Sequence, residues 1–216
     1  MNRHVRTLLV FAAFLAGLVL CAGVVLIARD RLGPGAPQAA AIGGPFRLID
    51  QDGRTVTEQD LKGRPSLVFF GFTHCPDVCP TTLFDISEIM RALGSDAERT
   101  RAAFITVDPE RDTQEVLKDY MSSFDPHVTG LTGDLPAITS VAKEYRAYFK
   151  KVNLDGGGYT MDHTAITYLM DKEGRFVSPF NLRRTPQASS MALAMAGDTQ
   201  KVAVSPTPLA PNGPFD

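Results

Sequence analysis

Residues 66–80 read SLVFFGFTHCPDVCP, an apolar run followed by two cysteines four positions apart, Cys75 and Cys79. The run Ser66–Phe72 has a continuous apolar centre, which is typical of a central strand covered on both faces. Apolar residues then recur with helical spacing and predict a helix over Thr81–Leu93. A buried strand that leads into a helix through a cysteine pair predicts a thioredoxin-like α/β fold.

The rest of the domain alternates strands with helices. We predict further strands at Phe46–Ile49, Thr55–Val56, Ala102–Val107, Val128–Leu131, Ala165–Met170 and Phe176–Pro179, and further helices at Thr113–Phe124, Pro136–Tyr148 and Pro186–Ala196. Turn residues at 52–53 and 172–174 predict two hairpins, and the glycines at 156–158 predict a loop. This order predicts a central mixed sheet, parallel at its centre, with helices on both faces.

The two ends of the chain have a different composition from this domain. Residues 8–28 are an unbroken apolar run, long enough for a transmembrane helix, and we prefer an uncleaved anchor over residues 1–31 to a cleaved signal peptide. A flexible linker is expected at 32–44, the folded domain at 45–197 and a disordered Pro-rich tail at 198–216. The charges that flank the apolar run favour a domain outside the cytoplasm. The net charge of -2 over 216 residues gives no basic excess for nucleic acid.

Cys75 and Cys79 can either close a disulfide or bind a soft metal together. Cys79 is expected at the first turn of the helix, where the helix N-terminus would favour a thiolate. A disulfide outside the cytoplasm would persist, but one closing so short a loop removes little chain entropy. Structural stapling alone is therefore a poor explanation of the pair.

A third ligand is expected at His163, which precedes a strand that should run close to the cysteine loop. Two thiolates and one imidazole suit Cu(I), and also Cu(II) with a further ligand, whereas structural zinc normally takes four protein ligands. The alternative for His163 is an ordinary surface histidine. His74 and Met161 are weaker candidates for ligands, and His127 is expected to be solvated.

At these residues the chain resembles the Sco/SenC family of membrane-anchored copper chaperones, which assist assembly of the CuA centre of cytochrome c oxidase. The resemblance covers residues 45 to 196, in four motifs taken in order: GFTHCPDVCP at 71–80, TVDPERDT at 106–113, GLTG at 130–133, and DHTA at 162–165 with YLMD at 168–171. It implies a copper site at Cys75, Cys79 and His163, with the family's nearby aspartate at Asp77.

The resemblance also implies partners and a location. The partners would be the oxidase subunit that carries the CuA cysteines and a thiol reductase or periplasmic copper donor. The domain would face the periplasm, or the mitochondrial intermembrane space. From the residues alone, Asp77 and Asp162 could equally be turn formers, and the charged loop at 108–112 could bind a partner or simply be solvated.

Three hypotheses for function follow. The first is a metallochaperone that carries copper on Cys75, Cys79 and His163. The second is a thiol-disulfide oxidoreductase in which Cys75 and Cys79 are a redox-active pair that keeps the CuA cysteines reduced, and His163 is dispensable. The third and weakest is a peroxidase, with Cys75 as the attacking thiol. Whether the chain is an enzyme at all depends on which hypothesis holds.

Overall fold

The computed structural model describes residues 15–23 and 42–183, together with residues 185, 187, 189, 190, 192 and 193. The chain forms two compact units, residues 1–40 and 41–216. In the first unit, residues 15–23 are helical. No helix in the described part of the chain combines the length and the apolar character that a bilayer span needs. Most of the predicted anchor and linker, and the whole predicted tail, lie outside the described residues.

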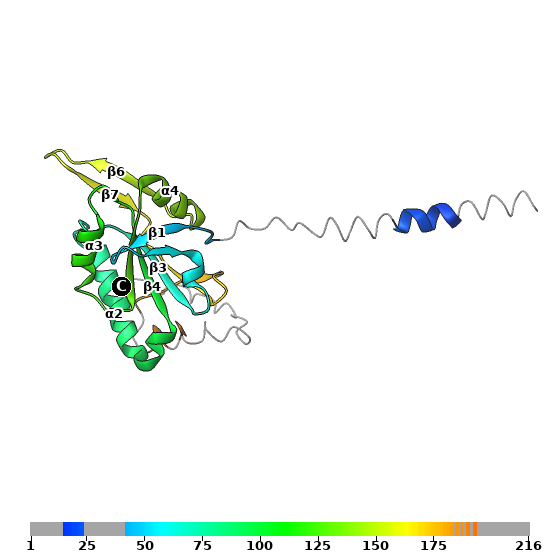
Figure 1. Ribbon diagram of the computed structural model, residues 1–216, viewed down its shortest axis with the longest axis horizontal. Coiled ribbons are helices and arrows are strands. Elements are labelled where there is room, and N and C mark those ends of the chain that lie inside the picture. Colours follow the sequence, from blue (N-terminus) through cyan, green and yellow to red (C-terminus); the bar gives the residue numbers. More distant parts are fainter. Residues whose placement is uncertain are drawn as a thin grey trace, which may run out of the picture. The chain divides into compact units, whose positions relative to one another are not determined.

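The second unit is built on a seven-stranded mixed sheet (Figure 1). Its strand order is β2-β1-β5-β4-β3-β8-β9, and only β3, β4 and β5 pair in parallel. The strands are β1 (Arg47–Asp50), β2 (Thr55–Thr57), β3 (Ser66–Gly71), β4 (Arg101–Thr106), β5 (Val128–Thr132), β8 (Thr167–Met170) and β9 (Phe176–Pro179). Two further strands, β6 (Phe149–Asn153) and β7 (Tyr159–His163), pair only with each other. The predicted α/β class, mixed sheet and thioredoxin-like layout are confirmed.

The second unit contains the helices α2 (Val78–Leu93), α3 (Gln114–Met121) and α4 (Leu135–Glu144), with short 3-10 helices η1 (Glu58–Leu61) and η2 (Gly94–Arg99). Helices α2 and α3 connect the parallel strands, and α3 and α4 begin at residues that the sequence explains. The predicted N-cap Thr113 accepts a hydrogen bond from the Val116 amide, and Asp134 accepts one from Ala137. The first amides of a helix have no hydrogen-bond acceptor within the helix, and a capping side chain supplies one. Thr113 and Asp134 therefore fix where α3 and α4 begin.

Strand β3 lies at the centre of the core and is buried along its whole length. Successive side chains of a strand point to opposite faces of the sheet. Accordingly, the Phe69 ring packs towards Phe104, which in turn contacts Tyr120 on α3. Phe70 packs instead against Tyr145 at the end of α4. The apolar run of β3 is thus continuous because side chains pack on both faces of the strand.

The main difference from the sequence prediction is the β6–β7 hairpin. The sequence predicted only a glycine loop there, and placed His163 at the entry of the next strand. The structure places His163 at the end of β7 instead. All of β6 except Phe149 is exposed, so the segment lacks the apolar alternation that identifies a half-buried strand.

Two smaller differences concern helices. Helix α4 ends at Glu144 rather than Tyr148, because Arg146 takes a left-handed backbone conformation with φ of 53° that no helix continues through. The helix predicted at 186–196 falls on a partly described stretch, in which residues 187, 189, 190, 192 and 193 are helical.

Candidate metal centre

The three predicted ligands come together in the structure. One ligand atom from each of Cys75, Cys79 and His163 lies within 4.8 Å of the other two. The two cysteines come from the loop between β3 and α2, whereas His163 comes from the end of β7, 84 positions after Cys79. In the described part of the chain this is the one group of three or more such side chains that could hold a metal ion.

The cysteine loop is organised by its own backbone. The Cys75 amide donates to the Phe72 carbonyl oxygen at 3.2 Å, and the Cys79 amide donates to the Cys75 sulfur at 3.4 Å. Cys79 lies in the first turn of α2, as predicted, two positions after the N-cap residue Asp77. Both sulfurs are therefore held at the positively polarised end of the helix.

Burial opposes the expected effect of that helix end on Cys79. Cys79 has no exposed surface, and burial raises the pKa of its thiol above the ordinary value. The expectation of a thiolate favoured by the helix N-terminus is therefore wrong for Cys79 in the metal-free protein. A thiol releases its proton when it coordinates a metal, so the buried thiol is suited to a bound cation rather than to a free thiolate.

His163 is oriented so that one ring nitrogen faces the sulfurs. Its Nδ1 lies 3.2 Å from the Thr164 carbonyl oxygen, to which it donates, and its Nε2 lies 3.5 Å from Cys79 Sγ. The bond at Nδ1 keeps the proton there and leaves the Nε2 lone pair free for a metal. Burial also lowers the pKa of His163, which keeps the imidazole neutral.

The spacing of the candidate ligand atoms fits a metal ion. Zinc forms bonds of about 2.3 Å to sulfur and about 2.0 Å to nitrogen, so one ion of this kind could bind Cys79 Sγ and His163 Nε2 at their separation of 3.5 Å. Two thiolates and an imidazole are a soft ligand set. The donor atoms and their separation therefore suit a soft cation with few ligands.

Gly71 makes room for the Cys79 sulfur at the end of β3. A Cβ at this position would lie 2.8 Å from Cys79 Sγ and 2.7 Å from the Phe104 ring. Real Cβ atoms essentially never approach other atoms so closely. Glycine is therefore required at position 71 for the sulfur and the aromatic core to meet.

Asp112 supports the cysteine loop, a role that the sequence prediction missed. Its carboxylate has no exposed surface and accepts hydrogen bonds from the Thr73 amide at 3.0 Å, the Thr73 hydroxyl at 2.6 Å and the Thr106 hydroxyl at 2.5 Å. Three donors compensate the burial of this carboxylate. The signal in the sequence was its place after β4, at the sheet edge where β3 also ends.

The weaker candidates from the sequence lie outside the three-residue group. The His74 side chain is half exposed and its Nδ1 contacts the Thr73 hydroxyl. His127 bonds instead to Asp125, at 2.7 Å. Met161 is buried in the core. Asp77, to which the resemblance assigned the nearby aspartate, is exposed and its side chain makes no capping bond.

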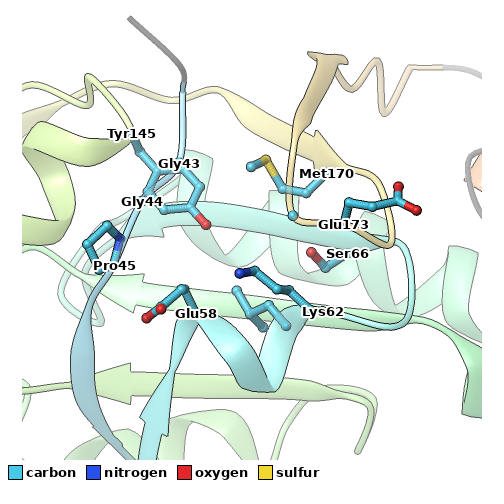
Figure 2. A pocket seen from close by; sticks show the side chains of 11 residues that line it. Gly43, Gly44, Pro45, Glu58, Lys62, Ser66, Tyr145, Met170 and Glu173 are labelled. Carbon is cyan, nitrogen blue, oxygen red and sulfur yellow. The ribbon is translucent and has the colours of Figure 1, made fainter. Parts of the chain in front are cut away.

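A separate cavity of about 200 Å³ lies at the opposite end of β3, where the strand begins (Figure 2). The side chains of Lys62, Ser66 and Tyr145 are directed towards it, and Met170 supplies the one sulfur among its lining residues. The Ser66 hydroxyl is buried without a hydrogen-bond partner in the described residues. Because no thiol or imidazole lines this cavity, it is not an alternative soft-metal site.

Comparison with known proteins identifies relatives over most of the domain. The family model described as SCO1/SenC matches residues 34–196. An SCO2-like protein of Rickettsia prowazekii is 45% identical over 143 residues, which cover 65% of this chain and 70% of the relative. The residues matched by the family model include all four sequence motifs and the three candidate ligands.

Solved structures agree with the fold. The structure of Bradyrhizobium japonicum ScoI with copper bound is 60% identical, with a TM-score of 0.71, and the match covers 72% of this chain and 99% of that one. The crystal structure of yeast Sco1 with copper bound is 36% identical, with a TM-score of 0.66, over 76% of this chain and 91% of that one. Both are structures of copper-bound proteins, so the relatives bind the metal that the ligand set suggested.

Proposed function

The chain belongs to the SCO1/SenC family, and we propose that it is a membrane-anchored metallochaperone that delivers copper to the CuA centre of cytochrome c oxidase. The observation that carries this proposal is the convergence of the Cys75 and Cys79 sulfurs and a His163 ring nitrogen within 4.8 Å. The copper-bound relatives support copper as the metal. Residues 8–28 would provide the anchor, with the domain in the periplasm or the mitochondrial intermembrane space.

The ligand set explains both binding and release of copper. Cu(I) would be held by the two thiolates and His163 Nε2, whereas Cu(II) would need a further ligand. Cys79 is fully buried but Cys75 keeps 9% of its surface exposed, next to the exposed residues 76–78. A thiolate of the acceptor can therefore approach from the Cys75 side and replace the ligands one at a time. No change of oxidation state is required for this exchange.

The test is Cu(I) affinity of the reduced full-length protein in detergent, measured by competition with a chelator. We expect Cys75→Ser and Cys79→Ser to abolish tight binding. His163→Ala should weaken binding by more than the about 10–100-fold that the loss of an outer-shell partner costs. His74→Ala is the matched control, because His74 is a neighbouring histidine outside the three-residue group, and it should bind as the unaltered protein does.

Equal affinities of the unaltered protein and His163→Ala would contradict the ligand assignment. A protein that binds copper but does not transfer it to a reduced peptide carrying the CuA cysteines would contradict delivery. The anchor has its own test, because a membrane-spanning chain should stay in the membrane pellet after extraction with alkaline carbonate.

A second candidate function, reduction of the CuA cysteines, is favoured by the proximity of the two sulfurs and the exposure of Cys75. The Cys75 thiolate would attack a target disulfide and release one target thiolate. The Cys79 thiolate would then attack the mixed disulfide, which frees the second target thiolate and leaves Cys75 and Cys79 joined. A partner thiol reductase must restore the pair. This activity should survive His163→Ala, which separates it from copper binding.

A further inference from the structure

The β6–β7 hairpin that carries His163 makes no backbone pairing with the main sheet. Four of the five β6 residues are exposed. Phe149, Met161 and part of Tyr159 pack on the core, and the His163 ring meets the core rings of Phe69 and Phe72 edge to face. A two-stranded hairpin is marginally stable on its own. Its placement, and with it the reach of His163, must therefore come from particular side-chain contacts.

Tyr159, the first residue of β7, is the centre of such contacts. Its hydroxyl donates to Asp108 Oδ1 at 2.9 Å, and its carbonyl oxygen accepts from Arg111 Nη1 at 3.0 Å. The Arg111 guanidinium carbon also lies 3.8 Å from the centre of the Tyr159 ring, a cation–π arrangement. Arg111 Nε in turn bonds to the buried Asp108 carboxylate. The hairpin clamp is formed by these three residues, Asp108, Arg111 and Tyr159.

The hairpin clamp is joined to a segment that also supports the cysteine loop. Asp108 and Arg111 lie between β4 and α3, and the Asp108 amide donates to the Thr106 hydroxyl at 3.0 Å. Four residues further on, Asp112 holds Thr73 at the start of the cysteine loop. One segment, 108–112, thus contacts both halves of the metal centre.

The clamp also reaches the histidine through an aromatic side chain. The Arg111 guanidinium carbon lies 5.8 Å from the centre of the Phe72 ring, and the His163 ring meets the Phe72 ring edge to face at 5.7 Å. Phe72 immediately precedes the cysteine loop. Movement of Arg111 would therefore change the position of the Phe72 ring, against which His163 packs.

We propose that the hairpin clamp positions His163 for the metal by holding the β6–β7 hairpin against the 108–112 segment. This inference rests on the proposed function of the site, since it concerns the same copper ligand. The clamp residues are positioning residues, because none belongs to the three-residue ligand group. The charged 108–112 loop then has a role within the molecule, in place of the partner contact or solvated face considered from the sequence.

The first experiment uses Tyr159→Phe, which removes only the hydroxyl that donates to Asp108. Tyr148→Phe is the matched control, since Tyr148 precedes the same hairpin and is 53% exposed. In the metal-free full-length protein in detergent, amide hydrogen exchange of 159–163 should accelerate in Tyr159→Phe and not in Tyr148→Phe. Exchange in β3 and α2 should stay unchanged in both variants.

The second measurement determines which ligands bind the copper ion. In the Cu(I)-loaded protein, X-ray absorption should show a weaker nitrogen shell in Tyr159→Phe with both sulfurs retained, approaching the spectrum of His163→Ala. Cu(I) affinity should fall about tenfold, at the lower end of the effect of outer-shell partners. A general loss of folding would reduce sulfur and nitrogen ligation together, so the selective loss of nitrogen distinguishes positioning from instability.

Arg111 provides a rescue series. Arg111→Met should remove the nitrogen shell, whereas Arg111→Lys keeps the cation and should restore part of it. Arg99→Met, an exposed arginine at the end of η2, is the control and should leave the spectrum unchanged.

Unchanged hydrogen exchange and an unchanged nitrogen shell in both Tyr159→Phe and Arg111→Met would overturn the inference. If the unaltered protein and His163→Ala gave the same copper spectrum, the proposed ligand set would fail instead. The exchange measurement needs no copper and would still decide whether the clamp holds the hairpin.

Discussion

The two halves of the metal centre are held in different ways. The cysteines follow β3, a strand with no exposed residue, and Cys79 itself belongs to the hydrophobic core. His163 ends a hairpin whose partner strand is largely exposed and which pairs with no other strand. The sulfurs are thus placed by apolar packing together with the hydrogen bonds of the cysteine loop, and the imidazole by a few polar and aromatic contacts.

Because of this difference, a change in one region can affect the stability of the domain without affecting the position of His163, and the reverse. Apolar packing acts over many contacts and is lost only when the core is damaged. A hairpin held by a few hydrogen bonds can lose its position while the domain stays folded. Changes in the core should therefore reduce stability, and equivalent changes in the hairpin should not.

The largest contrast should come from truncating a side chain in each region. Phe104 is fully buried between Phe69 and Tyr120, so Phe104→Ala should lower the free energy of unfolding by about 3–5 kcal/mol. Val152→Ala, in exposed β6, should change it by about 0.5 kcal/mol or less. Urea unfolding followed by circular dichroism measures both. Similar losses in the two variants would mean that the hairpin is part of the cooperative core.

A smaller contrast should come from adding one methyl group to a glycine in each region. Gly71→Ala places a Cβ 2.7 Å from the Phe104 ring and 2.8 Å from Cys79 Sγ, and overpacking of this kind costs about 1–3 kcal/mol. Gly156→Ala, in the turn between β6 and β7, meets nothing within 4 Å. We expect lower stability and weaker Cu(I) binding for Gly71→Ala, and neither for Gly156→Ala. A Gly71→Ala protein with unaltered copper affinity would show that the sulfur can move aside without cost.

The same contrast explains which parts of the fold could be predicted from the sequence. Strands β3, β4 and β5 and the start of α3 follow from apolar runs, helical spacing and the Thr113 cap, which are local signals. The β6–β7 hairpin has no such signal, because the charged and polar residues of β6 face solvent. The end of α4 depends on the backbone of Arg146, a conformation that sequence preference does not favour at a non-glycine residue.

Cys75 and Cys79 could be predicted as a pair because they lie four positions apart at a strand–helix junction. His163 could be predicted as their neighbour because it was expected before a strand that runs close to the cysteine loop. The supporting residues could not. Asp112 and Tyr159 act through contacts with residues 39 and 51 positions away, Thr73 and Asp108. The place of Asp112 after β4 indicates the edge of the sheet where it lies, but the sequence does not identify either partner. The resemblance assigned the family's nearby aspartate to Asp77, whose side chain is exposed and makes no capping bond.

The smallest expected effect concerns two histidines, one at the edge of the core and one on the hairpin. At the start of β5, the hydrogen bond to Asp125 raises the pKa of His127. Its contribution to stability is therefore fully present below about pH 6.5, the ordinary value, and is lost as pH rises through the raised pKa. Burial lowers the pKa of His163, so its contribution is present above about pH 6.5 and is lost as pH falls towards the lowered pKa.

The two substitutions should therefore change the pH dependence of stability in opposite directions. In the metal-free protein between pH 5 and pH 8.5, the stability lost in His127→Gln should be largest at low pH and shrink as pH rises. For His163→Gln the loss should shrink as pH falls, because the substitution removes the cost of protonating a buried ring. Each slope is limited to about 1.4 kcal/mol per pH unit, the value for one proton. Thermal unfolding across the pH series measures the differences, in which the carboxylates common to all variants cancel. A stability difference for His163→Gln that does not change with pH would mean that the hairpin leaves His163 open to water in the metal-free protein.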